Sequence, residues 1–488
     1  MEPTAARLST VGQGTRWTFF AYAYAGLIGL GVCYFILRIP LQVTDCLLLL
    51  IDSLNASSVW EQALRHSDRG GYFRPLYWGQ VKVLFDLAQG HYHLAFKGFQ
   101  SAQLLMLCWL FARYAQVRTM LDFAAFSLAV TILFGLHTLL GQVWEAYPTN
   151  HFLEISLACM LALHLSTTRP GRHLSDMLAV VTFAAALFTL ESGVVVWVCL
   201  VSAYLAGARG VSRNGLLVAT VILLGYFYVR FGYLGLGLPA LHERSSGFGF
   251  SRLDPGQLNR EFASGATWFY AYNVVASVLT VLFSEPRAGE WMFTRALVRG
   301  GMEPWMIINL VSSGLSSAAI LWYFAQALSG KAADDTREHT VRVAAPAAIL
   351  GNAVVSYAYT KDVIMAPAGL AYAILSFFAV RTVLGRLGEA GWRYRAASMA
   401  VLVLLVVGSA TWSARTVGTF YKMRQAAYEQ RNEWAEVDQW LLKQGVALKS
   451  PAETHLMETL RRAAVTSRAP NPYFAQPRAR LWVDQGQR

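Results

Sequence analysis

The sequence predicts an all-α membrane protein that crosses the bilayer many times, and two observations support this prediction. The chain is 55% hydrophobic and only 14% charged, whereas a soluble domain carries about 25% charged residues. It also contains several separate apolar runs of roughly 20 residues, the length at which a helix crosses the hydrocarbon core of a bilayer. The mean hydropathy of the chain is +0.38. We therefore expect a polytopic bundle of about eleven transmembrane helices.

The apolar runs define these spans in order along the chain. They lie near 17–38, 98–117, 120–141, 151–167, 175–190, 192–208, 215–234, 303–327, 342–359, 363–383 and 396–414. A further stretch, 266–284, is apolar enough to insert. It is also rich in Trp268, Tyr270, Tyr272 and Asn273, which suit an interfacial or re-entrant helix. Hydropathy alone leaves open whether this stretch crosses the membrane.

Arginines in the short loops set the expected orientation, because positively charged loops stay in the cytoplasm. The basic loops hold Arg113 with Arg118, Arg169 with Arg172, Arg209 with Arg213, and the stretch 381–395. These loops all lie on one side only if 266–284 does not cross fully. The expected topology is therefore eleven spans, with the N-terminus inside and the C-terminus outside.

Two long loops then lie on the external face, at 39–97 and 235–302. The first contains Leu47–Leu50, part of an amphipathic segment that predicts a helix lying on the membrane surface. Residues 1–415 form the expected transmembrane domain. The remaining tail, 416–488, has mixed charge and helical periodicity, which predicts one or two small soluble helices, also on the external side.

The net charge of +12 does not indicate a nucleic-acid partner. A nucleic-acid module would need a basic face on a soluble domain, whereas the arginines here gather in short loops between apolar runs. That pattern is typical of topology determinants and of contact with membrane lipids. The five cysteines show neither a disulfide framework nor the spacing of a metal site.

Asp45 is the first candidate for chemistry. It lies several residues beyond the first span, just before the amphipathic segment. A carboxylate held at the membrane interface is partly desolvated, which makes it a better proton acceptor and suits a general base. Asp is equally suited to cap the N-terminus of the helix, and the two roles are compatible. Asp52 and Asp68 are rival carboxylates in the same loop.

Arg74 is the second candidate, within the stretch RGGYFRPLYW (69–78). Pro75 fixes the backbone beside it, and Tyr72 and Phe73 belong to the aromatic group around it. An arginine in this setting suits a bidentate grip on a phosphate group. The same residues also fit an aromatic belt with a snorkelling arginine at the membrane surface. Spacing alone does not decide between these interpretations.

A polar group follows the third span. His137 closes that span, and Glu145, His151 and Glu154 lie shortly after it. Such a group could bind a metal ion or a sugar. Its spacing matches no standard metal site, so hydrogen bonding is the favoured role.

Two more charged residues interrupt apolar sequence. Glu191 stands between two apolar halves, where an ionisable residue has either a functional partner or a place in a hairpin turn. Lys361 lies on the expected external side beside Tyr359. It could pair with a lipid phosphate, or it could form an internal pair with Asp362.

Taken in order, these features resemble the membrane glycosyltransferases of the GT-C superfamily, and more closely the branch of protein O-mannosyltransferases, including tetratricopeptide-bearing ones. An acidic residue in the first external loop is followed by the aromatic-Arg-Pro-Leu element Phe73–Leu76, and then by GHYHLAFKGFQ (90–100). A later Lys-Glu-Ser/Gly element is matched by Leu190–Gly193, with Leu in place of Lys. The chain departs from the His-Pro…Glu signature, since it has His137-Thr138 and Gln142, and its tail shows no tetratricopeptide repeat.

The resemblance implies transfer of a sugar from a polyprenyl-phosphate donor to an acceptor hydroxyl, with inversion at the anomeric carbon. The acceptor would be a protein, a glycan or a lipid. The resemblance also implies roles for the residues: Asp45 as the base, Arg74 and Lys361 at the donor phosphate, and, at the sugar or acceptor, His137, Glu145, Glu191, Tyr72 and Tyr359. No metal ion is required, although a divalent cation is compatible with the superfamily.

Two other functions remain open on the sequence. One is a lipid or lipid-linked-sugar transporter or flippase. Such proteins often show internal repeats and broken helices, whereas this chain concentrates its polar residues in external loops and has unequal halves. The other is a non-catalytic assembly subunit of the same fold, because the paired acidic motif of the superfamily is reduced here to Asp45-Cys46. No organelle-retention signal is visible, so we expect a bacterial cytoplasmic membrane with the active site on the external, periplasmic face.

Overall fold

The structure of the chain is a computed structural model. It describes residues 4–65, 72–136, 138, 148–168, 173–236, 267–283, 290–329, 335–357, 362–389 and 395–466. The regular secondary structure of these residues is entirely helical, with no strand among them. The prediction of an all-α fold is confirmed.

Six helices are long and apolar enough to cross a membrane. They are α1 (Thr4–Ile36), α5 (Tyr92–Ala115), α11 (Arg213–Phe227) with its continuation η3 (Tyr228–Tyr233), α15 (Pro304–Leu328), α17 (Ala366–Glu389) and α18 (Arg395–Ala435). Five shorter apolar helices accompany them. These are α6 (Met120–Gly135), α8 (His151–Ser166), α9 (His173–Thr189), η2 (Glu191–Gly193) with α10 (Val194–Leu205), and α13 (Thr267–Phe283). The chain is therefore an integral membrane protein of the polytopic kind that the sequence predicts.

The set of apolar helices differs from the predicted spans at two places. It includes α13 and leaves out α16 (Thr336–Val355), whose first two turns carry four charged or ionisable residues that lower its hydropathy: Arg337, Glu338, His339 and Arg342. α13 packs against α15, α16 and α17. Its Asn273 donates a hydrogen bond from Nδ2 to the carbonyl of Tyr357, at 2.9 Å. The stretch predicted to be interfacial is thus a helix packed against the bundle.

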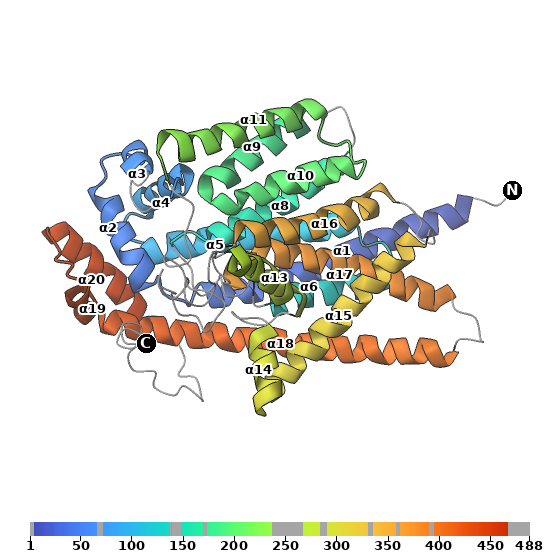
Figure 1. Cartoon of the computed structure of the whole chain (residues 1–488). Coiled ribbons are helices and arrows are strands. Elements are labelled where there is room, and N and C mark those ends of the chain that lie inside the picture. Colours follow the sequence, from blue (N-terminus) through green and yellow to red (C-terminus); the bar gives the residue numbers. More distant parts are fainter. Residues whose placement is uncertain are drawn as a thin grey trace.

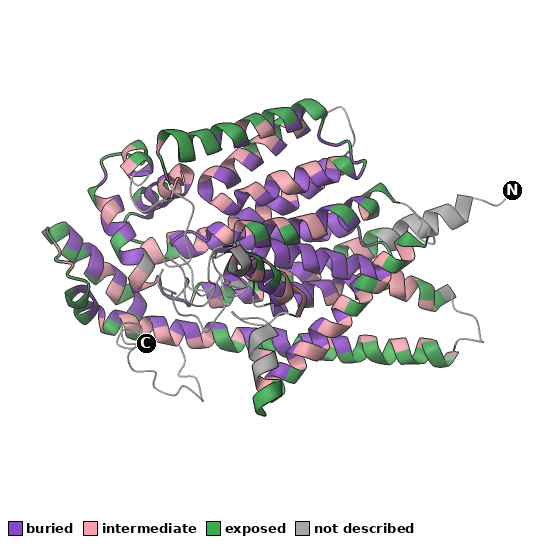
Figure 2. Ribbon diagram, in the orientation of Figure 1, coloured by how far each residue is buried: buried purple, intermediate pink, exposed green. Residues whose placement is uncertain are grey.

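The core of the bundle is built around α17. All of its apolar window is buried, whereas the outer edge of α11 is exposed (Figure 2). α17 packs against α6, α8, α15 and α16, which explains why its sequence is apolar on every face. Figure 1 shows the other helices arranged around it, with α1 and α18 running along the length of the molecule.

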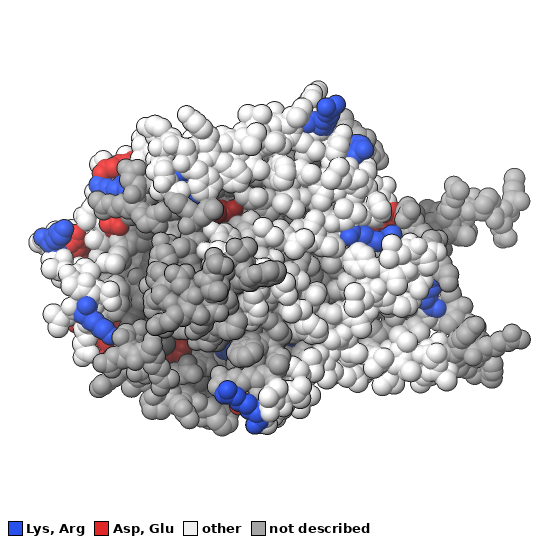
Figure 3. Space-filling view, viewed as in Figure 1, with Lys and Arg blue, Asp and Glu red and all other residues white. Residues whose placement is uncertain are grey.

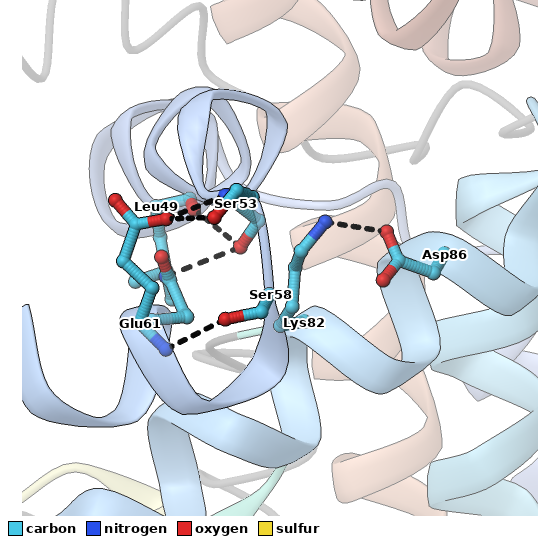
Figure 4. A network of polar contacts seen from close by, with 8 residues as sticks. Leu49, Ser53, Ser58, Glu61, Lys82 and Asp86 are labelled. Atoms are coloured by element: carbon cyan, nitrogen blue, oxygen red, sulfur yellow. Dashed lines mark hydrogen bonds and ion pairs between the residues drawn. The ribbon is translucent and has the colours of Figure 1, made fainter.

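One end of the bundle is formed by the first loop, and we call it the first-loop end. It contains η1 (Val43–Leu47), α2 (Leu48–Asn55), α3 (Val59–Arg65) and α4 (Pro75–Ala88). The helix that the amphipathic segment predicts is η1 with α2, and its apolar side is buried. Figure 4 shows how polar contacts hold this region together. The Ser53 hydroxyl donates to the carbonyl of Leu49 at 2.9 Å, and Lys82 pairs with Asp86 on α4 at 2.6 Å.

The C-terminal helices pack onto the first-loop end. α18 contains no proline and continues to Ala435, so the predicted domain boundary at 415/416 lies inside this helix. Beyond it come α19 (Val437–Lys443) and α20 (Pro451–Thr466). Trp434, on α18, donates from Nε1 to the carbonyl of Leu41 at 2.6 Å. Asn55, at the end of α2, donates to Glu453 of α20 at 2.8 Å. The C-terminal helices therefore contact and stabilise the helices of the first-loop end.

Charged side chains are sparse on the face shown in Figure 3. In that view they gather mainly over α3 and α20 at the first-loop end and around the loop between α10 and α11 at the opposite end. The largely uncharged surface between them fits helices that face hydrocarbon.

Candidate functional site

A carboxylate held between two arginines lies at the first-loop end of the bundle. Arg74 contacts Glu191 Oε2 through Nη2 at 2.7 Å and through Nε at 2.9 Å. Arg230 contacts the other oxygen, Oε1, through Nη1 at 2.6 Å. The three side chains come from positions 74, 191 and 230, so the fold assembles them from the start of α4, the turn before α10 and the end of α11. We call this group the Arg–Glu–Arg cluster.

Local structure fixes each member of the cluster. Arg74 is the residue before α4, and Pro75 occupies the first helical position, where proline needs no hydrogen-bond partner. Glu191 begins the 3₁₀ turn η2, directly after Leu190 leaves α9 in an extended conformation. A Cβ atom on Gly193 would lie 2.4 Å from the carbonyl carbon of Ala186. Only glycine therefore fits this turn, which sets the position of Glu191.

The arginine on α11 occupies an unusual backbone segment. Arg230 lies in η3, a π-helical extension of α11, and π-helical turns occur frequently at functional sites. Its Nη1 also contacts the hydroxyl oxygen of Tyr226 at 3.3 Å, one turn earlier. That hydroxyl donates in turn to the carbonyl of Phe73 at 3.3 Å. The contacts tie η3 to the residue immediately before Arg74.

Aromatic rings shield one side of the cluster. Phe73 packs against Tyr226, with ring centroids 5.6 Å apart, and edge-on against Phe188 at 6.0 Å. The Arg74 guanidinium lies 4.2 Å from the centroid of the Tyr72 ring, a distance at which a cation is attracted to the ring face. The predicted aromatic setting of Arg74 is therefore present, but its main contact among the described residues is Glu191.

The electrostatic balance of the cluster is positive. Two guanidinium groups face one carboxylate, and guanidinium stays protonated in proteins. The Arg230 side chain is 4% exposed, that of Arg74 is 18% exposed and that of Glu191 is 22% exposed. Partial burial lowers the effective dielectric constant and strengthens attraction to a further anion. The cluster is therefore suited to hold a phosphate group next to its internal ion pairs.

A second polar group lies on the neighbouring face of α8. The ring of His151, the first residue of α8, meets that of Tyr77 from α4 edge-on, with centroids 5.2 Å apart. His151 also lies within electrostatic range of Arg74 and Glu191. Glu154, one turn further along α8, lies within interaction range of the side chains of Gln80 from α4 and Gln103 from α5. The sequence had placed His151 and Glu154 near Glu145, and the structure places them beside the Arg–Glu–Arg cluster.

The predicted base lies at the same end of the molecule. Asp45 is within η1, and the residue capping that helix is Gln42. The interpretation of Asp45 as a helix cap is therefore wrong, because the helix starts two residues before it. The side chain of Asp45 lies outside what the structure describes. α2, which follows directly, packs on α4, whose N-terminus carries Arg74.

The other predicted residues divide into two groups. Asp52 lies on α2, and its backbone carbonyl accepts from the amide of Ala56 at 3.1 Å. The remaining predicted residues lie outside the described part of the chain: Asp68, His137, Glu145, Tyr359 and Lys361. The structure thus brings together Tyr72, Arg74 and Glu191 from the predicted set.

Arg230 and Tyr226 were missed by the sequence interpretation. Both lie in the run that predicts the span at 215–234, where the apolar signal is dominant. An arginine inside an otherwise apolar helix is itself a signal, because such a residue needs a partner at membrane depth. The four-residue spacing of Tyr226 and Arg230 places them on one helix face.

Among the described residues, no group of three or more His, Cys, Asp and Glu side chains is arranged to hold a metal ion. The five cysteines are buried, and none of them forms a disulfide.

No protein-family model and no curated protein matches the sequence. Among solved structures, the chain is similar to the archaeal oligosaccharyltransferase AglB from Archaeoglobus fulgidus, in complex with an inhibitory peptide and a dolichol-phosphate. The two are 12% identical, with a TM-score of 0.38 over 94% of this chain and 61% of that protein. This chain thus spans less than two thirds of its neighbour. A likeness at this level does not place the chain in a family.

Proposed function

We propose that the chain is a GT-C-type glycosyltransferase. It would move a sugar from a polyprenyl-phosphate donor to an acceptor hydroxyl at the external face of the membrane. The observation that supports this proposal is the convergence of Arg74 and Arg230 on Glu191, so that two guanidinium groups meet one carboxylate in a partly buried site at one end of a helix bundle. Arg74 also belongs to the Phe73–Leu76 element, on which the resemblance to the O-mannosyltransferase branch rests.

The two arginines fit the charge change that the reaction requires. The leaving group is a polyprenyl phosphate, which gains negative charge as the bond from its oxygen to the anomeric carbon breaks. Fixed guanidinium groups stabilise that charge without reorganising. Glu191 holds both arginines in place before the donor arrives, because it bonds to one with each oxygen. We assign Glu191 to positioning the arginines rather than to contacting the sugar.

The acceptor side of the reaction needs a base. In the proposed step the Asp45 carboxylate takes the proton of the acceptor hydroxyl, and the acceptor oxygen forms the new bond to the anomeric carbon. Attack from the face opposite the phosphate inverts that carbon. Asp45 is the preferred base because it lies in η1, at the start of the interfacial segment that follows the first span, and Asp52 and Asp68 are the alternatives.

The remaining assignments complete the proposal. Lys361 adds a second positive group at the donor phosphate, and Tyr72 packs on Arg74. His137, Glu145 and Tyr359 contribute to binding the sugar or the acceptor. The acceptor is a protein, a glycan or a lipid, the membrane is a bacterial cytoplasmic membrane, and the reaction needs no metal ion.

A transfer assay with the purified chain tests the proposal. Polyprenyl-phosphate-linked hexose carrying a radioactive sugar is mixed with peptide, glycan and lipid acceptor fractions, and labelled product is separated. We expect wild type to form product and Asp45→Asn to lose at least about 100-fold of the rate, the scale of general-base catalysis. An Asp45→Asn variant that turns over at the wild-type rate would contradict the assignment of the base.

The same preparation separates the enzyme from the transporter. In proteoliposomes, a flippase would move the labelled donor between leaflets while leaving the sugar attached to its lipid phosphate. A transferase would release the polyprenyl phosphate. Donor movement without release, in wild type and Asp45→Asn alike, would overturn the proposed function. A chain that binds the donor and does neither would be the non-catalytic subunit.

A further inference from the structure

Glu154 and the two glutamines beside it, Gln80 and Gln103, form what we call the Glu154 group. The Oε1 atom of each of these three side chains is buried and receives no hydrogen bond from any described residue. Each atom is shielded from solvent. Buried acceptors left without donors are destabilising and uncommon in folded proteins. Three of them in one group indicate that a donor belongs there.

The arrangement of the amides explains why the group is rich in acceptors. The side chains of Gln80 and Gln103 both lie within interaction range of Glu154. An ionised carboxylate only accepts hydrogen bonds, so it favours the NH₂ end of each glutamine over the carbonyl end. The carbonyl ends of both amides are then left to accept. Three helices supply these side chains, and α5 packs on both α4 and α8, so the helix packing sets the arrangement.

The charges nearby limit what the donor can be. The group itself holds a single carboxylate, and its neighbours include Arg74 and Glu191, which both interact electrostatically with His151 one turn before Glu154. The carboxylate of Glu191 is already paired with arginine, so a cation at the group would be repelled by Arg74. A neutral molecule with several hydroxyl groups satisfies the acceptors without adding charge.

The position of the group relates it to the cluster. His151 and Glu154 lie one turn apart on α8, and Tyr77 and Gln80 lie one turn apart on α4. Since the rings of His151 and Tyr77 are in contact, the two pairs face each other. A ligand whose phosphate lies at Arg74 would place its next few atoms toward this face.

We propose that Gln80, Gln103 and Glu154 form the sugar-recognition site, which accepts hydrogen bonds from the hydroxyl groups of the donor sugar. This inference rests on the proposed function, because it takes the cluster as the site of the donor phosphate. Glu154 is the specificity-determining residue, and the two glutamines orient it. Discrimination between sugars follows from the match between their hydroxyl groups and three fixed acceptors.

Affinity for two probes tests the inference on the purified full-length chain in detergent. The probes are polyprenyl phosphate and the same lipid phosphate carrying one hexose, measured by native mass spectrometry and by a fluorescence titration. We expect wild type to bind the hexose-bearing lipid about tenfold more tightly than the bare lipid phosphate. Glu154→Ala and Glu154→Gln should both remove this preference while binding the bare lipid phosphate as wild type does.

The matched control is Gln62→Ala. Gln62 is also a buried glutamine whose Oε1 has no partner among the described residues, but it lies on α3. The Gln62→Ala variant should keep the tenfold preference for the hexose-bearing lipid phosphate. The comparison is made on protein whose melting temperature matches that of wild type.

The outcomes separate the two proposals. Equal affinities of wild type for the two probes, or a preference that survives both Glu154 substitutions, would overturn the sugar-recognition site and show that the acceptors bind only water. Wild-type protein that binds neither probe would overturn the proposed function itself.

Discussion

Glu191 and Glu154 are the same residue type at the same end of the bundle, and their partners differ. Glu191 bonds to two guanidinium groups, one at each oxygen. Glu154 lies within interaction range of two neutral amides, and its buried Oε1 has no hydrogen-bond partner among the described residues. The first carboxylate is neutralised and holds its arginines in place. The second keeps capacity to accept another hydrogen bond, which is what a ligand site needs.

The largest expected effect is on stability at Glu191. Glu191→Gln removes the charge that pairs with Arg230, whose side chain is 4% exposed. Breaking such a pair is expected to lower the free energy of unfolding by about 3 kcal/mol. Glu154→Gln is the matched change at the other site, and it should lower stability by less than about 1 kcal/mol because its partners are neutral. Unfolding by denaturant in detergent measures both. Equal losses of unfolding free energy in the two variants would contradict the difference in pairing between Glu191 and Glu154.

A smaller effect is expected at the turn that carries Glu191. Gly193→Ala places a Cβ atom 2.4 Å from the backbone of Ala186, so the turn must shift. We expect a loss of about 2 kcal/mol, typical of overpacking, together with weaker binding of lipid phosphate. Gly314→Ala on α15 is the control, since a Cβ there meets no atom within 4 Å. Unchanged melting temperature and binding in Gly193→Ala would show that the turn does not position Glu191.

The smallest effect concerns a carboxylate outside the membrane. Glu453 accepts hydrogen bonds from the Asn55 amide and the backbone amide of Lys449, which hold the pKa of its carboxyl below the ordinary value. A lowered pKa in the folded state stabilises the fold above the ordinary carboxyl pKa, and the contribution disappears as the pH falls. Docking of α20 on α2 should therefore loosen in acid.

Hydrogen exchange of the α20 amides, followed from pH 7 down to about pH 3, checks this effect. The protection of these amides, which is the intrinsic exchange rate divided by the observed rate, should decrease in wild type as the pH falls. In Glu453→Gln the protection should already be low at neutral pH. Protection of α20 that is independent of pH would contradict the role of Glu453.

The helices were largely predictable because hydropathy is a local property of sequence. The runs at 363–383 and 303–327 predicted α17 and α15, since an apolar stretch of that length has few alternatives to a helix in a membrane. α13 and α16 were harder, because their aromatic or charged residues reduce the contrast between a span and a surface helix. The helix containing Asp45 began before the predicted cap, since apolar residues such as Val43 already belong to it.

The site was predictable only in parts. Arg74 and Glu191 were each recognised from their local sequence, yet nothing local shows that residues 117 positions apart form an ion pair. Arg230 was missed because it lies within an apolar run, and Gln80 and Gln103 have no sequence signal beyond being polar. Their roles depend on how α4, α5 and α8 pack, which is a tertiary property.

Binding of bare polyprenyl phosphate is the most direct test of the central claim, that the Arg–Glu–Arg cluster holds the phosphate of a lipid-linked donor. Dissociation constants are measured for wild type, Arg74→Lys, Arg74→Ala and the control Arg209→Ala, whose arginine lies in the loop at the opposite end of the bundle. We predict that Arg74→Ala weakens binding at least about tenfold, Arg74→Lys weakens it less, and Arg209→Ala leaves it unchanged. Equal binding by all four proteins would contradict the account.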